Sequence, residues 1–158
     1  MASSFTALLV YIDDIILMSS DHKSADEVKH FLSTKFKIKN LDSLKYFLGM
    51  EIAQSNDGIQ VCQSKYTLDI LFETCMLAAK PSPIPMEPNI KLQKEEGVVF
   101  HDPTLYRKLV GKLLYLTNTW PDISYNVNLL SQFMEAPQIL HYDALIKVIQ
   151  YLKNAPGQ

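Results

Sequence analysis

The chain has 158 residues, of which 47% are hydrophobic, enough to bury a core as one domain or as a small domain with an appendage. Its formal net charge of −2 argues against a general basic coat for nucleic-acid binding. Two cysteines, Cys62 and Cys75, are too few for a disulfide framework, so a reducing compartment is the simpler assumption. No apolar run approaches the roughly 18 residues that span a bilayer, and the N-terminus lacks a basic region. These features favour an intracellular protein with no membrane partner.

Two adjacent aspartates, Asp13 and Asp14, interrupt an apolar run over residues 8–18. Residues that favour extended backbone flank the pair, which predicts a buried β-hairpin with the aspartates at its tip. Two like charges this close repel each other unless a cation neutralises them. The pair therefore predicts a divalent metal site, and Mg²⁺ suits it because Mg²⁺ uses few protein carboxylates. The alternative is a pair of ordinary turn residues on a solvated hairpin, although continuously apolar arms favour cover on both faces.

A helix is predicted next, starting at the capping box of Ser24 and Glu27. Its apolar stripe, expected to face the core, comprises Val28, Phe31, Leu32 and Phe36. The segment 28–41 contains no acidic residue and carries four lysines, Lys29, Lys35, Lys37 and Lys39. Such a charge run is usually solubilising surface, and contact with a phosphate backbone is the second possibility.

A second hairpin is predicted over residues 44–62. Residues 44–53 alternate with period two, residues 56–58 supply turn chemistry, and residues 59–62 return antiparallel. Gly49 is expected to mark a bulge or a close backbone approach. A short helix follows from Ser64 to about Thr74. Four prolines then predict a linker or surface strap over residues 80–99, because proline disfavours regular helix.

Three amphipathic helices are predicted in the last third of the chain. The first begins at Asp102 and Pro103, a capping acid before a proline. The second begins at Pro121 and ends before Pro137, and the third covers about residues 139–153. Short connections between such helices predict a compact bundle. The apolar positions expected in its core are Leu105, Leu109, Leu113, Leu116, Ile123, Val127, Leu130, Met134, Ala144, Leu145, Val148, Ile149 and Leu152.

Tyr11, Ile12, Asp13 and Asp14 between hydrophobic strands resemble the active-site hairpin of reverse transcriptases. Residues 44–52, 106–117 and 121–125 resemble the copia-type branch of LTR-retrotransposon reverse transcriptases, so the resemblance covers about residues 8–157. It implies that Asp13 and Asp14 are catalytic and hold Mg²⁺ or Mn²⁺ in the complete enzyme, with Asp13 the direct ligand. It also implies weak nucleic-acid contacts from Tyr11, Lys29, Lys35, Lys37, Lys39 and Gly49, the last in a hairpin similar to a primer grip.

The expected fold is α+β, with β-hairpins of a partial polymerase palm packed with helices and followed by a small helical bundle. The resemblance implies a partial palm over residues 1–80, a Pro-rich linker over residues 81–101 and thumb-like helices over residues 102–158. Template–primer of RNA or DNA and deoxynucleoside triphosphates are then the substrates of the complete enzyme. The remaining polyprotein domains, namely fingers, RNase H and integrase, are expected partners, in a cytoplasmic virus-like particle or in the nucleus.

No acidic residue precedes Asp13, whereas the third metal-binding aspartate of the family lies on a strand well upstream. The chain is therefore interpreted as the C-terminal part of an RNA-directed DNA polymerase from a retrotransposon polyprotein, whose two-metal nucleotidyl transfer needs the complete enzyme. We expect the isolated chain to be inactive, as the product of a truncated element or an incomplete gene. The alternative is an inert remnant that at most binds nucleic acid or protein.

Overall fold

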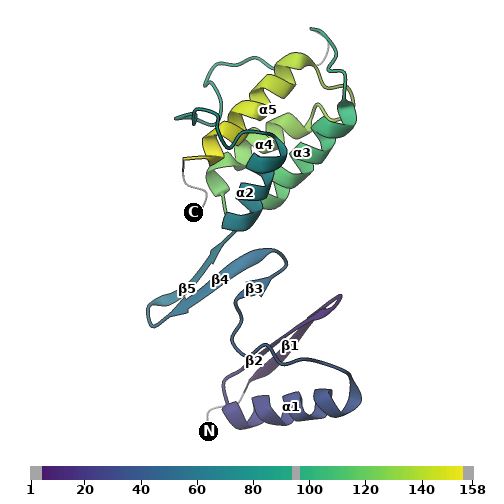
Figure 1. Cartoon of the computed structure of the whole chain (residues 1–158), viewed down its shortest axis with the longest axis vertical. Coiled ribbons are helices and arrows are strands. Elements are labelled where there is room, and N and C mark those ends of the chain that lie inside the picture. The colour runs from purple at the N-terminus through teal and green to yellow at the C-terminus, as the bar shows by residue number, and fades with distance from the viewer. Residues whose placement is uncertain (1–4, 94–96, 155–158) are drawn as a thin grey trace. The chain divides into compact units, whose positions relative to one another are not determined.

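The computed structural model describes residues 5–93 and 97–154. Figure 1 shows the chain, which divides into two compact units, Met1–Leu48 and Gly49–Gln158. The described residues form five α-helices and two small sheets, so the predicted α+β class is confirmed. No helix among them has the length and apolarity to cross a bilayer. The palm, linker and thumb-like boundaries expected from the sequence remain a prediction, since compact units need not coincide with such regions.

The first unit opens with a β-hairpin of strands β1 (Thr6–Tyr11) and β2 (Asp14–Ser19). The strands pair antiparallel from Thr6 opposite Ser19 to Tyr11 opposite Asp14, which confirms the predicted hairpin. The predicted burial is wrong for this unit, because apolar side chains on both arms are exposed. In the described part of the unit only helix α1 packs against the hairpin, through β2, and one helix cannot cover both faces of a sheet.

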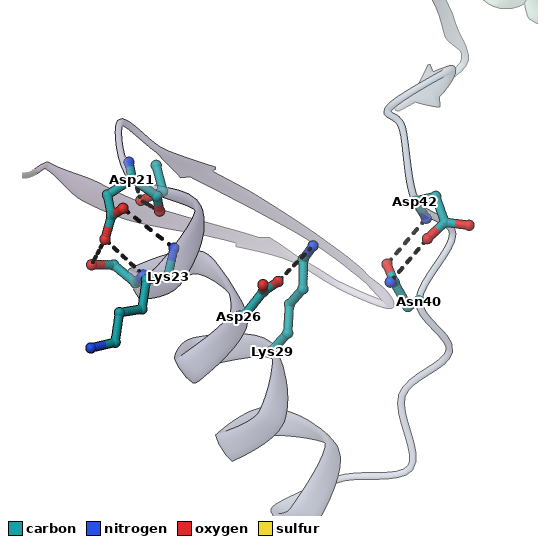
Figure 2. A network of polar contacts seen from close by, with 8 residues as sticks. Asp21, Lys23, Asp26, Lys29, Asn40 and Asp42 are labelled. Carbon is teal, nitrogen blue, oxygen red and sulfur yellow. Dashed lines mark hydrogen bonds and ion pairs between the residues drawn. The ribbon is translucent and has the colours of Figure 1, made fainter.

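Helix α1 (His22–Lys35) begins two residues before the predicted start. Its N-cap is Asp21, whose carboxylate accepts hydrogen bonds from the backbone N–H of Lys23 (3.4 Å) and of Ser24 (3.0 Å), as Figure 2 shows. Ser24 is not the cap that was predicted, because its hydroxyl donates a hydrogen bond to the Asp21 carboxylate (2.8 Å). The expected core stripe is wrong as well, since no residue of α1 is buried and Phe31 and Phe36 are exposed.

The chain then forms the short strand β3 (Tyr46–Phe47) and turns at Leu48 and Gly49, whose φ angles are 51° and 76°. Strands β4 (Met50–Ser55) and β5 (Gly58–Cys62) pair antiparallel, which confirms the second hairpin with a later start than residue 44. The left-handed φ of Gly49 explains this glycine, since residues with a Cβ rarely adopt that conformation. Gly49 therefore allows the backbone to turn between β3 and β4.

The second unit is built around a helical bundle. It comprises α2 (Ser64–Glu73), α3 (Pro103–Leu116), the 3₁₀ helix η1 (Pro121–Ile123), α4 (Ser124–Ser131) and α5 (Ile139–Leu152). These helices share one apolar core. Eleven of the thirteen predicted core positions are buried, and Leu105 and Met134 are partly buried against that core. Asp102 caps α3 by accepting the N–H of Leu105 (2.9 Å), with Pro103 in the first turn, as predicted.

The described residues of the proline-rich segment after α2 form no regular helix, as predicted, and they pack onto the bundle as a strap. We call residues 79–93 and 97–100 the proline-rich strap. Met86 and Phe100 of this strap are buried in the bundle core, and Ile90 and Leu92 are partly buried against it. The strap therefore belongs to the core of the second unit and is more than a tether between helices.

Candidate functional site

The tip of the β1–β2 hairpin is a two-residue turn formed by Ile12 and Asp13. Asp14 is the first residue of β2, opposite Tyr11. The side chains of Tyr11, Asp13 and Asp14 are all exposed. The structure therefore places Asp13 in an exposed turn and Asp14 at the adjoining start of β2, with the predicted nucleic-acid contact Tyr11 opposite Asp14.

The backbone of this tip is strained, as it is at three other described non-glycine residues, Asp42, Leu48 and Cys75. Ile12 has a φ of 51° and is 80% exposed, although a bulky β-branched residue rarely adopts the left-handed conformation. Gly, Asn or Asp would fit such a turn at lower cost. Strain of this kind costs about 1–3 kcal/mol and collects at functional sites. A β-branched residue held in this turn therefore supports a functional role for the tip.

Hydrogen bonds at the open end of the hairpin fix its register. The hydroxyl groups of Thr6 and Ser19 lie 2.9 Å apart, and Phe5 and Ser20 exchange backbone and side-chain bonds, including Ser20 N–H to Phe5 O at 2.9 Å. A slip of one residue would turn every side chain to the opposite face. These contacts therefore determine which aspartate lies in the turn and which lies in the strand.

The donor set at the tip suits a hard divalent cation. Mg²⁺ is usually held by one or two carboxylates and takes its other ligands from water and substrate phosphates. Asp13 and Asp14 supply two carboxylates, and no group of three or more His, Cys, Asp or Glu side chains gathers anywhere in the described residues. The tip thus fits a metal shared with a phosphate-bearing substrate better than a closed protein cage.

The predicted basic segment lies in the same unit as the tip. Lys35 ends α1, and Lys37 and Lys39 follow it in irregular backbone, all exposed. Lys29 differs, because its ammonium lies 3.7 Å from the Asp26 carboxylate on the same helix, as Figure 2 shows. Three of the four predicted lysines therefore have no ion pair among the described residues.

A turn closes the basic segment. The Asn40 side chain donates to the Asp42 carboxylate (3.1 Å) and accepts from the Asp42 N–H (3.1 Å), which Figure 2 also shows. Asp42 has a left-handed φ of 60°, a conformation that Asp tolerates better than most residues. Asp42 is the first acidic residue after α1, and it is thus held in a local turn four residues beyond Ile38.

Lysines of the second unit are used differently from those of the basic segment. Lys108 and Lys112 of α3 both form ion pairs with Glu73 at the end of α2. Hydrogen bonds from Lys108 and then Lys112 hold the pKa of the Glu73 carboxyl below its usual range. These exposed and half-exposed pairs join two helices, so the cations are partly neutralised within the protein.

The second unit holds one predicted site residue and one buried ionisable residue that the sequence reasoning missed. Gly49, a predicted nucleic-acid contact, starts the second unit, and a Cβ at this position would lie 3.8 Å from the hydroxyl of Tyr115. His141, in the first turn of α5, is fully buried. Its only sequence signal is its place in the apolar stripe that continues through Ala144, Leu145 and Val148.

Comparison with known proteins identifies the family of the chain. The model of a family described as "Reverse transcriptase (RNA-dependent DNA polymerase)" matches residues 3–88, just over half of the chain. The sequence is 42% identical over 98% of its length to a retrovirus-related Pol polyprotein from transposon RE1 of Arabidopsis thaliana. It is 31% identical over 98% of its length to the corresponding polyprotein from transposon TNT 1-94 of Nicotiana tabacum.

A shorter relative matches at similar strength. An uncharacterized mitochondrial protein of Arabidopsis thaliana is 38% identical over 93% of the chain, which covers 61% of that relative. By contrast the chain spans only 10% of the RE1 polyprotein and 12% of the TNT 1-94 polyprotein. No solved structure matches the chain.

Proposed function

Because this chain belongs to the reverse transcriptase family of copia-type retrotransposons, we propose that its β1–β2 hairpin is the metal-binding tip of an RNA-directed DNA polymerase. Asp13 is the direct Mg²⁺ or Mn²⁺ ligand, and Asp14 completes the acidic tip. The first unit and the β4–β5 hairpin correspond in this proposal to part of a polymerase palm, and the helices to a thumb-like region. The observation that carries it is the pair of exposed carboxylates on the strained turn at Ile12.

The residues of the chain have a limited and definable task in this chemistry. A divalent cation in such a site activates the primer hydroxyl and stabilises the leaving pyrophosphate. Asp13 projects from a two-residue turn whose register is fixed by the bond between Thr6 and Ser19. Preorganised ligands avoid the cost of ordering at the moment of reaction. The hairpin therefore supplies position and negative charge.

The substrates and partners follow from the same proposal. They are an RNA or DNA template–primer, deoxynucleoside triphosphates and the other polyprotein domains, namely fingers, RNase H and integrase. A virus-like particle in the cytoplasm, or the nucleus, would be the place of action. The alternative, an inert module that binds nucleic acid or protein, is favoured by one observation, the run of exposed lysines after α1.

A chimaera tests the proposal. The segment of the RE1 polyprotein that aligns with this chain, 42% identical to it, is replaced by this chain, and the purified chimaera is assayed for primer extension on an RNA template with Mg²⁺. We expect template-dependent extension from the chimaera and none from the isolated chain. A folded chimaera that binds template–primer without extending it would favour the inert binding module.

We expect the basic segment to contribute a weak, non-specific and salt-dependent affinity for nucleic acid, because phosphate contacts release counterions. Replacing Lys29, Lys35, Lys37 and Lys39 by Gln should weaken the binding of single-stranded RNA measured by fluorescence anisotropy. It should also flatten the dependence of affinity on salt, with Lys29 contributing least because of its ion pair with Asp26.

Lys108 and Lys112 provide the control, since both are already paired with Glu73. Their replacement by Gln should change RNA affinity less per charge removed than replacement within the basic segment. RNA binding that is unchanged when all four lysines of the segment are replaced would remove these residues from the proposed site.

We also expect the isolated chain to self-associate through its first hairpin. Apolar side chains are exposed on both arms, and no Pro or Lys lies in residues 8–18 to blunt an exposed strand edge. Size-exclusion chromatography with light scattering should report species larger than a monomer, and Val10→Lys should reduce them. A stable monomer in which amides of β1 exchange as slowly as those of α3 would contradict this expectation.

A further inference from the structure

The proline-rich strap runs along α5 in the opposite direction to the helix. Several contacts fasten it, and in five of them the number of the partner on or beside α5 falls as the strap residue number rises. In order they are Ala79 O with Lys153 Nζ (2.6 Å), Ser82 N–H with Gln150 O (3.3 Å), Glu87 with Lys147, Val98 O with Ile139 N–H (2.9 Å) and Phe100 N–H with Pro137 O (2.8 Å). The strap is thus attached at both ends of α5.

A sixth contact lies within this series. It is the only described contact between the strap and α5 that a buried ionisable side chain makes. The Nε2 atom of His141 lies 3.0 Å from the backbone carbonyl of Gln93 in the strap. Its Nδ1 atom lies 3.1 Å from the backbone N–H of Gln138, in a reciprocal capping box at the start of α5. The imidazole also stacks on Phe133, with ring centroids 3.9 Å apart and planes at 22°.

These partners determine the protonation state of the ring. A backbone N–H only donates and a carbonyl only accepts, so Nδ1 must be the acceptor and Nε2 must carry the proton. His141 is therefore neutral in the folded chain. A second proton on Nδ1 would place two donors against each other and leave a charge in a fully buried position.

We propose that His141 is an acid-released latch, which holds the proline-rich strap on α5 while the imidazole is neutral and frees it when the imidazole takes up a second proton. Release uncovers Met86, Ile90 and Leu92, which now pack on the bundle core. The latch thus couples protonation of one side chain to exposure of an apolar stretch, independently of the hairpin tip.

Among the described residues, no acidic group forms an ion pair with His141. The described ionisable groups of the strap and of α5 besides His141 are Lys80, Glu87, Lys91, Tyr142, Asp143, Lys147 and Tyr151, and His101 and Asp102 lie just before α3. Burial lowers the pKa of His141, and the hydrogen bond to the Gln93 carbonyl opposes this effect. None of these groups contributes to the lowered pKa of His141, and Glu87 is paired with Lys147.

The direction of the pH effect follows from the lowered pKa. Below the ordinary histidine pKa of 6.5 the released form binds a proton more readily than the latched form. The latch therefore has its full strength above about pH 6.5 and weakens as the pH falls from there towards the pKa of the folded state. Acid should therefore raise the fraction of chains in which the strap is released.

Hydrogen exchange of the full chain tests the latch. Opening of the strap at the amides of Phe100 and Ile139, which bind across to their partners, is compared at about pH 7 and about pH 5 after correction for the intrinsic exchange rate. We expect opening to be more frequent at the lower pH, because the pKa of His141 is lowered in the latched form. Amides that pair β4 with β5 serve as the internal reference and should show a smaller change.

Three variants separate the latch from other sources of pH dependence. His141→Gln keeps a neutral acceptor at the third helical position, as in a capping box, and should abolish the difference between the two pH values. His101→Gln removes the only other histidine of the second unit and should leave the difference intact. Glu87→Gln removes the ion pair with Lys147 and should also leave it intact.

Two results would overturn the proposal. One is equal opening of the strap at both pH values in the unmodified chain, and the other is a folded His141→Gln variant that keeps the full difference. If that variant does not fold, the imidazole signals of the unmodified chain decide by NMR titration. A His141 ring that titrates at or above 6.5 would then refute the latch, and a lower value that coincides with strap opening would support it.

Discussion

Replacing Leu113 by alanine should lower the free energy of unfolding of the helical bundle by about 2–5 kcal/mol. Leu113 is 0% exposed in α3 and lies in the shared core of the bundle. The substitution removes buried apolar surface and leaves a cavity in a close-packed interior. Because small domains are stable by only about 5–15 kcal/mol, the loss would be a large share of the total.

Urea unfolding followed by tryptophan fluorescence measures this effect. Trp120 is the single tryptophan of the chain and is buried in the bundle, so the signal reports on the second unit. The matched control is Leu68→Ala on α2, where the leucine is 45% exposed, and its effect should stay within about 0.5 kcal/mol. Similar losses from the two substitutions would contradict the description of this core.

The bundle was predictable because its signals are local and repeated. Helical spacing of leucines, a capping acid before Pro103 and short connections all agree with one another. The apolar stripes then fix which faces meet, and Leu109, Leu113 and Leu116 are buried as predicted. Both hairpins were predictable for a similar reason, since extended runs flank a short break that contains aspartate in each. The first turn nevertheless lies one residue earlier than the predicted pair, at Ile12 and Asp13, and Asp14 begins β2.

Helix α1 shows where such signals fail. Asp21 and Ser24 both have side chains that can cap a helix, and a sequence pattern does not state which one wins. In the structure Asp21 binds two backbone N–H groups and the Ser24 hydroxyl. The stripe with Phe31 and Phe36 has the spacing of a core face, but burial needs a partner surface, which the periodicity of a single segment does not provide.

The long-range contacts were beyond a sequence reading for another reason. Glu73 binds two lysines more than 30 residues away, and His141 binds a carbonyl 48 residues away. Each contact depends on how the helices and the strap pack, so no fixed spacing in the sequence predicts it. The hairpin tip is the opposite case, because Asp13 and Asp14 are adjacent and their placement needs only a local turn.

In the chimaera with the RE1 polyprotein, Asp13→Asn should reduce primer extension by about a thousandfold. A metal ion contributes several kcal/mol to stabilising the transition state, and about 4 kcal/mol corresponds to that factor. Asn is nearly the same size as Asp and tolerates the same turn, so the β1–β2 hairpin should keep its register. The loss then reports the missing negative charge.

Asp14→Asn should cost less than Asp13→Asn, because Asp14 lies in the strand opposite Tyr11 whereas Asp13 lies in the turn. Asp57→Asn is the control, since Asp57 occupies the turn between β4 and β5, and extension should be nearly unchanged. Rates from single-turnover assays would separate loss of chemistry from weaker template binding. If Asp14→Asn abolished extension while Asp13→Asn retained it, the direct ligand would be Asp14, and the strained turn at Ile12 would serve to aim the strand carboxylate.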